Sequence, residues 1–388
     1  MDKKVILCVD DELIILNSLK QELSERFAET MIIEVAESGD EGLEIIDFFR
    51  EKGKEVVLII SDYIMPQMKG DEFLIEAHKV LPNTMKILLT GQASLEGVTN
   101  AVNKTNLYRY IPKPWKTRDL IMTVEGAIEN YNKDKLLKSQ NRQIQSSIRY
   151  AERIQSAVLP SSKYLSEVFP NHFVFYQPKD VVSGDFYWAR EEGNKTIIAV
   201  ADCTGHGVLG AFMSLIGHQL LNRAIVDKKI YSPEEILKNM NTAIRNVWSE
   251  KQVNSREGME VAICVIDKEE KKLSFAGARR PICIIENGSL NYIKGDRAGI
   301  EGKENAFYSK HEFDLRPNTQ IYLYSDGYQD QFGGIQNRRF MSKNLRDLFV
   351  SIENKSSKEQ LEEIASTFTE WKRNYDQIDD VLVLGIHL

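Results

Sequence analysis

One aspartate, Asp202, stands where a mostly apolar run ends and a glycine-rich turn begins. Residues 196–201 predict a buried strand, Gly205 and Gly207 frame the turn, and a helix is expected from residue 208. A carboxylate at a strand end, beside backbone amides and a helix start, is suited to bind hard cations and phosphate oxygens. By itself the pattern more often marks an ordinary strand, turn and helix with an aspartate cap. Its meaning therefore depends on the other acids of the chain.

More acids are expected at strand edges in the same part of the chain. Together with Asp202 they are Asp185, Asp326, Asp379 and Asp380. Carboxylates without a cluster of Cys or His fit Mg²⁺ or Mn²⁺ and fit zinc poorly. Two such ions about 3.5–4 Å apart share a water, lower its pKa and clamp a phosphate for in-line attack. The set predicts a two-metal phosphoester site, in which His206 is either a general acid or a histidine that holds the turn.

The first third of the chain alternates short apolar runs with helical patterns. Strands are expected at residues 5–9, 31–36, 56–60, 86–90 and 107–111, and helices at 13–27, 42–49, 73–80, 95–102 and from 116. Five such units form a doubly wound α/β domain, (βα)5, whose ligands bind at the carboxyl ends of the strands.

Polar residues follow four of these strands. Asp10 and Asp11 follow the first strand and Asp62 the third, whereas Thr90 and Lys113 follow the last two. Three carboxylates at one edge repel each other unless a cation such as Mg²⁺ lies among them. Asp62 is then ionised and able to attack a phosphoryl group. Thr90 and Lys113 would stabilise the phosphoryl oxygens.

Residues 1 to about 125 resemble the receiver domain of two-component response regulators. The resemblance rests on V-D-D-E at 9–12, S-D-Y-I-M-P-Q-M-K-G at 61–70, L-L-T-G at 88–91 and Y-I-P-K-P-W at 110–115. It implies that Asp62 accepts phosphate from a histidine kinase and that Asp10 and Asp11 help to hold Mg²⁺. It also implies that Thr90 and Tyr110 rearrange on phosphorylation, and that a cis peptide bond precedes Pro114.

A long helical pattern without proline follows, and we assign residues 123–160 as a linker. Apolar residues recur at spacings of three or four, but the apolar seam is thin and interrupted. A long, mostly polar helix is stable through a partner helix or through many surface pairs. The pattern predicts a dimeric coiled coil, with a single solvated spacer helix as the alternative.

The first predicted domain covers residues 1–122, and the linker follows it. Residues 161–388 form the third predicted region. Strands are expected at residues 173–176, 186–190, 196–201, 261–266, 273–276, 282–286, 290–293, 321–324 and 381–386. Helices are expected at 208–226, 233–248, 342–350 and 357–375. Two sheets with helices outside them give an α+β layered β-sandwich.

Residues 150–388 resemble the PPM-type metal-dependent Ser/Thr protein phosphatases, in their bacterial SpoIIE-like branch. The matching motifs are R-Y-A-E-R-I-Q-S-A-V-L-P at 149–160, S-G-D-F-Y-W at 183–188, A-D-C-T-G-H-G at 201–207, G-M-E-V-A-I at 258–263, A-G-A-R-R-P at 276–281, Y-S-D-G-Y-Q-D-Q-F-G-G at 324–334 and D-D-V-L-V at 379–383. The resemblance implies that Asp185 and Asp202 bridge two Mn²⁺ or Mg²⁺ ions. Asp326 and Asp379 would complete one metal site and the Cys203 carbonyl would contribute to the other.

The same resemblance leaves three residues with looser roles. Asp380 would position a water that binds a metal. Arg279 and Arg280 either bind the substrate phosphate, because a guanidinium matches phosphate bidentately, or form a surface turn pair.

Composition narrows the class of protein and its surroundings. The chain has 388 residues, a net charge of -7 and four cysteines far apart in the sequence. The negative charge argues against nucleic acid as a partner, and no apolar run approaches the roughly 20 residues that span a bilayer. Acidic residues interrupt the first apolar run, so no signal peptide is expected. These features predict a cytoplasmic protein with reduced cysteines and no membrane partner.

Together the motifs predict a homodimeric response regulator whose receiver controls a phosphatase. The resemblance implies that its substrate is a phosphorylated anti-sigma-factor antagonist of the STAS type. Two alternatives are a catalytically weak phosphatase fold that serves as an adaptor, and a hydrolase of small phosphate esters. The adaptor would be expected to lack metal carboxylates, whereas this sequence keeps them.

Overall fold

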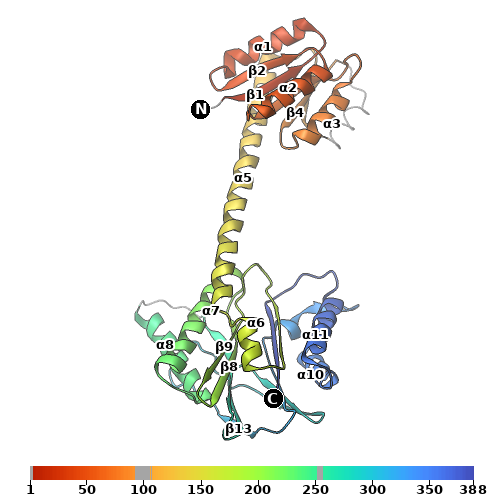
Figure 1. Ribbon diagram of the computed structural model, residues 1–388. Coiled ribbons are helices and arrows are strands. Elements are labelled where there is room, and N and C mark those ends of the chain that lie inside the picture. The colour runs from red at the N-terminus through yellow and green to blue at the C-terminus, as the bar shows by residue number, and fades with distance from the viewer. Residues whose placement is uncertain (1–2, 92–104, 106, 251–256) are drawn as a thin grey trace. The chain divides into compact units, whose positions relative to one another are not determined.

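The computed structural model describes residues 3–91, 105, 107–250 and 257–388. The helix expected at residues 95–102 lies outside the described residues. The chain divides into two compact units, residues 1–143 and 144–388 (Figure 1). Helix α5 (Thr117–Val158) begins in the first unit and ends in the second. We describe each unit by itself.

The first unit contains a five-stranded parallel sheet with the strand order β2-β1-β3-β4-β5. Its strands are β1 (Lys4–Val9), β2 (Met31–Ala36), β3 (Val56–Asp62), β4 (Met85–Thr90) and β5 (Leu107–Pro112). Its helices, besides the start of α5, are α1 (Leu13–Phe27), α2 (Gly39–Glu51) and α3 (Gly70–Val80). The doubly wound fold predicted from the sequence is confirmed, and the Lys113–Pro114 bond is cis as expected.

Two apolar clusters lie on opposite faces of this sheet. Leu16 and Leu19 of α1 and Leu120 of α5 pack in one cluster. Residues of α2 and α3, among them Ile46 and Phe73, pack in the other. Because the three inner strands, β1, β3 and β4, are covered on both faces, their sequences read as mostly continuous apolar runs rather than as alternating patterns. This burial leaves the carboxyl ends of the strands as the place for polar side chains.

A lysine is buried inside this unit, on strand β4. The side chain of Lys86 is fully buried, and its Nζ donates to the carbonyl oxygens of Thr84 (2.9 Å) and Leu81 (3.3 Å). Its Nζ also lies 3.1 Å from Nδ1 of His78. Burial disfavours the charged form and lowers the pKa of Lys86 to about 8.

Replacing Lys86 by Met should therefore change how stability depends on pH. Between the folded-state pKa of about 8 and the usual 10.5, the unfolded chain keeps a proton that the folded chain has lost. As the pH rises through this window, the free energy of unfolding of the parent should thus increase by about 2 kcal/mol relative to that of Lys86→Met. Denaturant unfolding of the first unit within the full chain, at pH 7.5 and 10, measures the difference. Lys79→Met, at an exposed position, is the control, and a difference that stays constant with pH would contradict the assignment.

The second unit contains two five-stranded antiparallel sheets. One has the order β13-β10-β9-β8-β7 and the other β12-β11-β14-β17-β6. The strands of the first sheet are β7 (Phe186–Glu192), β8 (Lys195–Cys203), β9 (Met259–Asp267), β10 (Lys272–Ala278) and β13 (His311–Asp314). Those of the second are β6 (His172–Gln177), β11 (Ile282–Glu286), β12 (Ser289–Ile293), β14 (Gln320–Tyr324) and β17 (Val381–His387).

Helices cover the outer faces of both sheets, so the unit has four layers (Figure 1). A middle cluster, with Ile198 of β8 and Leu384 of β17, fills the space between the sheets. Helices α7 (Gly207–Asn222) and α8 (Pro233–Glu250) pack on the first sheet, and α10 (Ser342–Ser351) and α11 (Ser357–Lys372) on the second. The layered sandwich predicted from the sequence is confirmed.

Several local features differ from the expectation. The helix expected at residues 208–226 ends in a π-helical turn, η1 (Arg223–Asp227), and the helix expected at 357–375 ends at Lys372. The short elements α6 (Ser162–Val168), α9 (Gly327–Asp330), β13 and the hairpin of β15 (Phe332–Gly333) and β16 (Arg338–Arg339) were not predicted. Strands of two to four residues and short helices carry too few positions for a periodic pattern to emerge.

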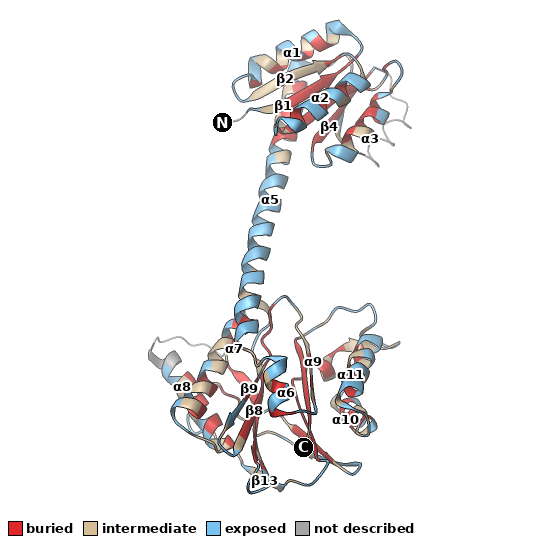
Figure 2. Cartoon of the chain, in the orientation of Figure 1, coloured by how far each residue is buried: buried red, intermediate tan, exposed pale blue. Residues whose placement is uncertain are grey.

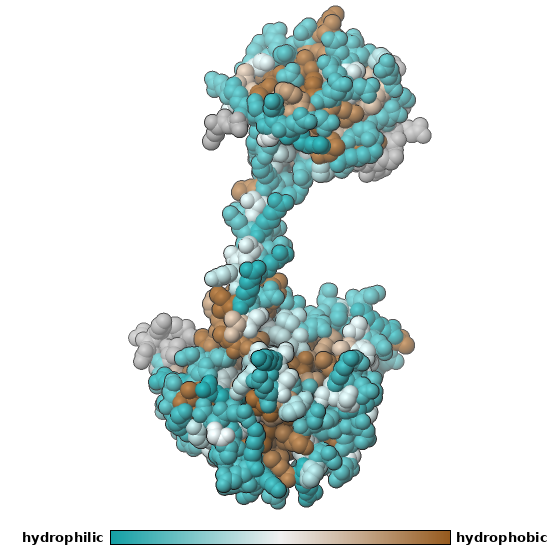
Figure 3. Space-filling view, in the orientation of Figure 1, coloured by the Kyte–Doolittle hydropathy of each residue, from teal (hydrophilic) through white to brown (hydrophobic). Residues whose placement is uncertain are grey.

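Helix α5 is exposed along its middle (Figure 2), where its side chains are mostly hydrophilic (Figure 3). Large apolar side chains are nevertheless exposed on it, namely Leu136, Leu137, Ile144, Tyr150 and Ile154. Leu137, Ile144 and Ile154 belong to the thin apolar seam expected from the sequence, and the dimeric coiled coil stays a prediction. No helix among the described residues is both long enough and apolar enough to cross a membrane.

Candidate functional site

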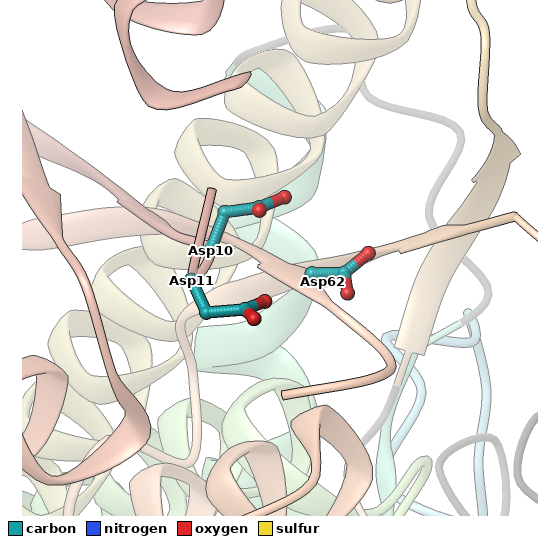
Figure 4. Close-up of side chains that lie close together, drawn as sticks. All are labelled: Asp10, Asp11 and Asp62. Atoms are coloured by element: carbon teal, nitrogen blue, oxygen red, sulfur yellow. The ribbon is translucent and has the colours of Figure 1, made fainter. Parts of the chain in front are cut away.

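Three carboxylates meet at the carboxyl edge of the first unit's sheet. Asp10 and Asp11 follow β1, and Asp62 is the last residue of the neighbouring strand β3. Ligand oxygens of the three lie within 4.8 Å of one another (Figure 4), and this is the one such group among the residues that the structure describes. Parallel neighbouring strands bring their ends to one edge, which is why distant residues converge here.

Lys113 and Thr90 flank these carboxylates. Nζ of Lys113 lies 2.7 Å from Oδ2 of Asp10 and 2.7 Å from Oδ1 of Asp62. The side chain of Thr90 is buried, and its Oγ1 has no hydrogen-bond partner among the described residues. An unpaired buried hydroxyl is costly, so Thr90 is a donor ready for an incoming oxygen. Tyr110 has a side chain that is about half exposed.

Electrostatics at this edge favour a bound cation. Burial raises the pKa of Asp10, although hydrogen bonds from Lys113 and from the Glu12 amide oppose it. Burial alone would lower the pKa of Lys113, but its hydrogen bonds to Asp10 and Asp62 outweigh burial and raise it. Three oxygen donors of one charge fit Mg²⁺, which prefers carboxylates and keeps several waters.

A glycine allows the backbone to close around Asp62. Helix α3 begins at Gly70, and a Cβ there would lie 1.8 Å from the carbonyl oxygen of Asp62. The amide of Ile64 donates to Oδ2 of Asp62 at 3.0 Å. The end of β3 is thus held between α3 and the following loop, which fixes the direction of the Asp62 carboxylate.

In the second unit, acids from both sheets gather at their edges. Asp202 lies on β8 and pairs across the ladder with Glu260 of β9. Asp326 follows β14 in the other sheet and stands directly before α9. All three contact one nitrogen, Nη2 of Arg280, at 3.0 Å from Asp202, 2.5 Å from Glu260 and 2.6 Å from Asp326. These carboxylates therefore converge on one cationic position.

Asp185 lies beside this cluster and is almost completely buried. It directly precedes β7, the neighbour of β8, and its Oδ2 has no hydrogen-bond partner among the described residues. Burial, followed by the nearby Asp202, raises the pKa of Asp185 well above its usual value. Burial likewise raises the pKa of Asp202 against the opposing charge of Arg280. Buried acids that repel each other are stabilised when divalent cations bind among them.

Asp379 and Asp380 precede β17 and differ in their roles. Asp380 is buried and accepts hydrogen bonds from the amides of Lys179 and Gly184, both at 2.7 Å. It thereby ties the loop that carries Asp185 to the second sheet. Asp379 is more accessible, and burial and the charge of Asp326 raise its pKa. Oxygen donors from both sheets thus face one region, a set that fits Mg²⁺ or Mn²⁺.

The structure places the remaining predicted residues as follows. Cys203 is the last residue of β8, next to Asp202, and its side chain is buried. Arg279 contacts Glu260 (3.3 Å) and Glu301 (2.6 Å), so both guanidinium groups of the A-R-R-P turn face carboxylates. Their predicted contact with substrate phosphate stays a prediction.

Sequence reasoning missed Glu260 and did not foresee the pairing of Arg280. The motif G-M-E-V-A-I contains Glu260, but only the cross-strand register places it opposite Asp202. The available signal was a single acid inside an apolar strand sequence. Because a buried charge needs a partner, such an acid indicates a nearby cation or basic side chain.

His206 lies at the edge of the acidic cluster, as the residue before α7. Its Nδ1 is 2.7 Å from Oδ2 of Asp180, and its Nε2 is 3.0 Å from Nζ of Lys179. All three side chains are at least partly exposed. A carboxylate that holds one ring nitrogen fixes the orientation of the imidazole.

A glutamine from α5 holds the loop of Asp185. Gln155 is buried, and its Nε2 donates to the carbonyl of Ser183 (2.6 Å) and to Oγ of Ser214 on α7 (2.8 Å). Its Oε1 accepts from the amide of Ser183 at 3.1 Å. The hydroxyl of Ser183 in turn accepts from the amide of Asp185 at 3.0 Å. The end of α5 is therefore linked by hydrogen bonds to the backbone of a predicted metal ligand.

Comparisons with known proteins match both units. The family model of Stage II sporulation protein E (SpoIIE) matches residues 192–388, about half of the chain, and that of the response regulator receiver domain matches residues 6–125. The SiaA-PP2C domain of Pseudomonas aeruginosa is similar in structure, with a TM-score of 0.60 and 31% identity, over 64% of this chain and 98% of that domain.

Curated relatives match less than half of the chain. The hydrogenase transcriptional regulatory protein HoxA of Bradyrhizobium diazoefficiens is 26% identical over 160 residues, 41% of this chain and 31% of the relative. HoxA of Cupriavidus necator is 32% identical over 124 residues, 32% of this chain and 24% of the relative. The chain thus spans less than a third of the length of these relatives. With half of its residues matched by the SpoIIE model, the chain belongs to the SpoIIE family and carries a response regulator receiver domain before its PP2C-type domain.

Proposed function

We propose that this chain is a response regulator whose receiver is phosphorylated on Asp62 and controls a metal-dependent phosphoserine/phosphothreonine phosphatase. The observation that carries the proposal is the convergence of Asp202, Glu260 and Asp326 on one cationic position in a PP2C-type fold. The buried Oδ2 of Asp185 beside them, which has no hydrogen-bond partner in the described part of the chain, supports it. Such a set is expected in a site that holds cations against phosphate.

In the receiver, Asp62 is the proposed nucleophile toward a phosphoryl group from a histidine kinase. Asp10 and Asp11 would hold Mg²⁺ with it, since their oxygens lie within 4.8 Å of one another. Lys113 already contacts Asp62 and would neutralise a phosphoryl oxygen. The buried hydroxyl of Thr90, which has no hydrogen-bond partner among the described residues, would donate to another.

In the phosphatase, two Mn²⁺ or Mg²⁺ ions held by Asp185, Asp202, Asp326 and Asp379 would polarise the phosphate and activate a water. Asp380 would keep the Asp185 loop in place through its two backbone hydrogen bonds. His206, oriented by Asp180, would hold the proton for the leaving serine or threonine oxygen. Lys179, next to His206, would attract the substrate phosphate.

The proposed partners follow from the family. The substrate would be a phosphorylated STAS-type anti-sigma-factor antagonist, the phosphodonor a sensor histidine kinase, and the active species a homodimer joined along α5. Exposed apolar side chains on α5, such as Leu137 and Ile144, support the dimer because a second helix would bury them.

The test compares phosphoserine, phosphothreonine and phosphotyrosine peptides incubated with the full chain and Mn²⁺. Release of phosphate from the first two, abolished by EDTA, is the expected result. Equal release from phosphotyrosine, or release that persists in EDTA, would contradict the proposed specificity or the metal requirement. A chain that hydrolyses none of the peptides would favour the adaptor alternative.

Replacing Gln155 by Leu should weaken the phosphatase without touching a metal ligand. The change leaves the amide and carbonyl of Ser183 buried without partners, at a cost of about 1–3 kcal/mol for each group. Because Asp185 lies two residues further on, we expect the Mn²⁺ concentration for half-maximal activity to rise and kcat/KM to fall about 10-fold or more. Titration of activity with Mn²⁺ measures both. Gln145→Leu, exposed on the same helix, should match the parent, and a parent-like Mn²⁺ curve for Gln155→Leu would refute the role.

Inserting two residues after Gln140 should uncouple the two activities. Two residues rotate the chain that follows by about 200° around a helix of 3.6 residues per turn. Receiver phosphorylation and basal phosphatase activity should both survive. The change in phosphatase rate that follows modification of the receiver with beryllofluoride should be lost. An insertion of seven residues, about two full turns, is the control and should keep the response. A two-residue variant that responds as the parent does would show that α5 is a passive tether.

A further inference from the structure

A pocket of about 750 Å³ lies beside the hairpin of β15 and β16, and we call it the hairpin groove. Its walls come from this hairpin, the start of α10 and the end of α11. The residues that matter below are Ile335, Arg338, Arg339, Met341, Trp371 and Arg373. None of them is a predicted metal ligand, and the function proposed above does not use them.

The hairpin groove combines positive charge with exposed apolar surface. Three arginines line it against one acid, Glu370, although the chain as a whole has a net charge of -7. Within the described part of the chain, Arg338 and Arg373 have no ion-pair partner. The side chains of Ile335 and Met341 are 86% and 57% exposed. Unpaired cations around apolar side chains are typical of a surface that binds an acidic partner.

The backbone of the hairpin groove is held in unfavourable conformations. Met341 has φ 77° and Arg373 has φ 51°, a region that side chains other than glycine rarely adopt. A hydrogen bond from the Met341 amide to the Gln329 carbonyl, at 2.7 Å, fixes the first of them. Strain of this kind persists where the surrounding structure imposes it, and it gathers at binding sites.

The hairpin groove also adjoins the acidic cluster. Nη1 of Arg339 lies 3.3 Å from Oδ2 of Asp330, the last residue of α9, and Asp326 stands directly before that helix. The buried Gln331 comes next, and it accepts a hydrogen bond from Trp371 and donates to the carbonyl of Asp376, near Asp379. Four helical residues rise about 6 Å, a distance that two extended residues of a bound peptide span.

We propose that the hairpin groove is the docking surface for an acidic segment of the phosphoprotein substrate, placed within a few residues of the phosphorylated side chain. The inference rests on the proposed phosphatase function and adds a substrate preference to it. Arg338 and Arg373 contact the acidic side chains, and the exposed Ile335 and Met341 cover an apolar one. When the phosphorylated side chain of the substrate binds at the carboxylate cluster, the neighbouring residues of the substrate lie over the groove.

The experiment compares the full chain with the double variant Arg338→Glu/Arg373→Glu. The probes are a phosphoserine peptide flanked on both sides by Glu and Leu, the same peptide with Gln in place of Glu, and p-nitrophenyl phosphate. We expect the parent to prefer the acidic peptide and the double variant to raise its KM about 10-fold or more, with kcat nearly unchanged. Hydrolysis of p-nitrophenyl phosphate should stay within about two-fold, because this ester is too small to reach the groove.

A matched control is Lys163→Glu/Lys358→Glu, which changes the net charge equally at two exposed positions that do not line the groove, one on α6 and one in the first turn of α11. Fluorescence anisotropy with the unphosphorylated peptides in EDTA measures docking apart from catalysis. Tighter binding of the acidic peptide, lost in the groove variant but kept in the control, supports docking even if no ester is hydrolysed. Equal KM values for both peptides, equal loss in the control, or a change only in oligomeric state would overturn the proposal.

Discussion

Replacing Asp202 by Asn is expected to lower phosphatase turnover by about 10²-fold or more, even with saturating Mn²⁺. Asp202 connects the acids of the two sheets. It pairs with Glu260 across the ladder of the first sheet, and both Asp202 and Asp326, which follows β14 of the second sheet, contact Arg280. An amide keeps the shape of the side chain but removes the charge that would be shared by both ions. Steady-state hydrolysis of a phosphoserine peptide measures the loss.

The control for this variant lies on the same pair of strands. Asp267→Asn is at the opposite end of the ladder, where Asp267 pairs with Lys195, and it should keep parental turnover. Circular dichroism of both variants separates lost chemistry from lost folding. Turnover of Asp202→Asn within a few-fold of the parent would remove Asp202 from the metal site.

Replacing Asp62 by Asn should abolish phosphorylation of the receiver. Acetyl phosphate with Mg²⁺ is expected to label the parent once, at Asp62, because its carboxylate contacts Lys113 and lies at the sheet edge where β4 ends in Thr90. An amide is not a nucleophile toward phosphate, so the loss should be complete.

Intact-mass measurement of the phosphorylated chain tests this expectation. Asp47→Asn, an exposed receiver acid, is the control and should be labelled like the parent. Label that persists in Asp62→Asn would place the acceptor elsewhere. Loss of label in both variants would point instead to general damage of the receiver.

The receiver could be predicted closely because its signals are local. Each buried strand reads as a mostly apolar run, and Asp10, Asp62, Thr90 and Lys113 each stand at the end of a strand or directly after it. In a parallel sheet the carboxyl ends of the strands meet at one edge, so the positions of these residues in the sequence were enough to predict that their side chains lie close together. No further information about packing was needed to place them.

The second unit could be predicted only in part. Its strands and layers follow from apolar patterns, but its carboxylates come from two sheets whose relative placement is a tertiary property. Glu260 became visible only through its register with Asp202, and Gln155 through its packing against Ser183. Polar residues inside apolar or helical sequences, as at Gln155 and Lys86, were the signal that was available.

The four cysteines have a practical consequence for experiments on this protein. All four are buried, and burial raises the pKa of Cys8 and of Cys283 to about 12 and that of Cys203 and Cys264 above its usual value. At neutral pH only about one such thiol in 10⁵ is a thiolate, the form that reacts with maleimides. A spin label or dye attached at Gln140→Cys would therefore report on α5 alone, in the native background and without removing any cysteine.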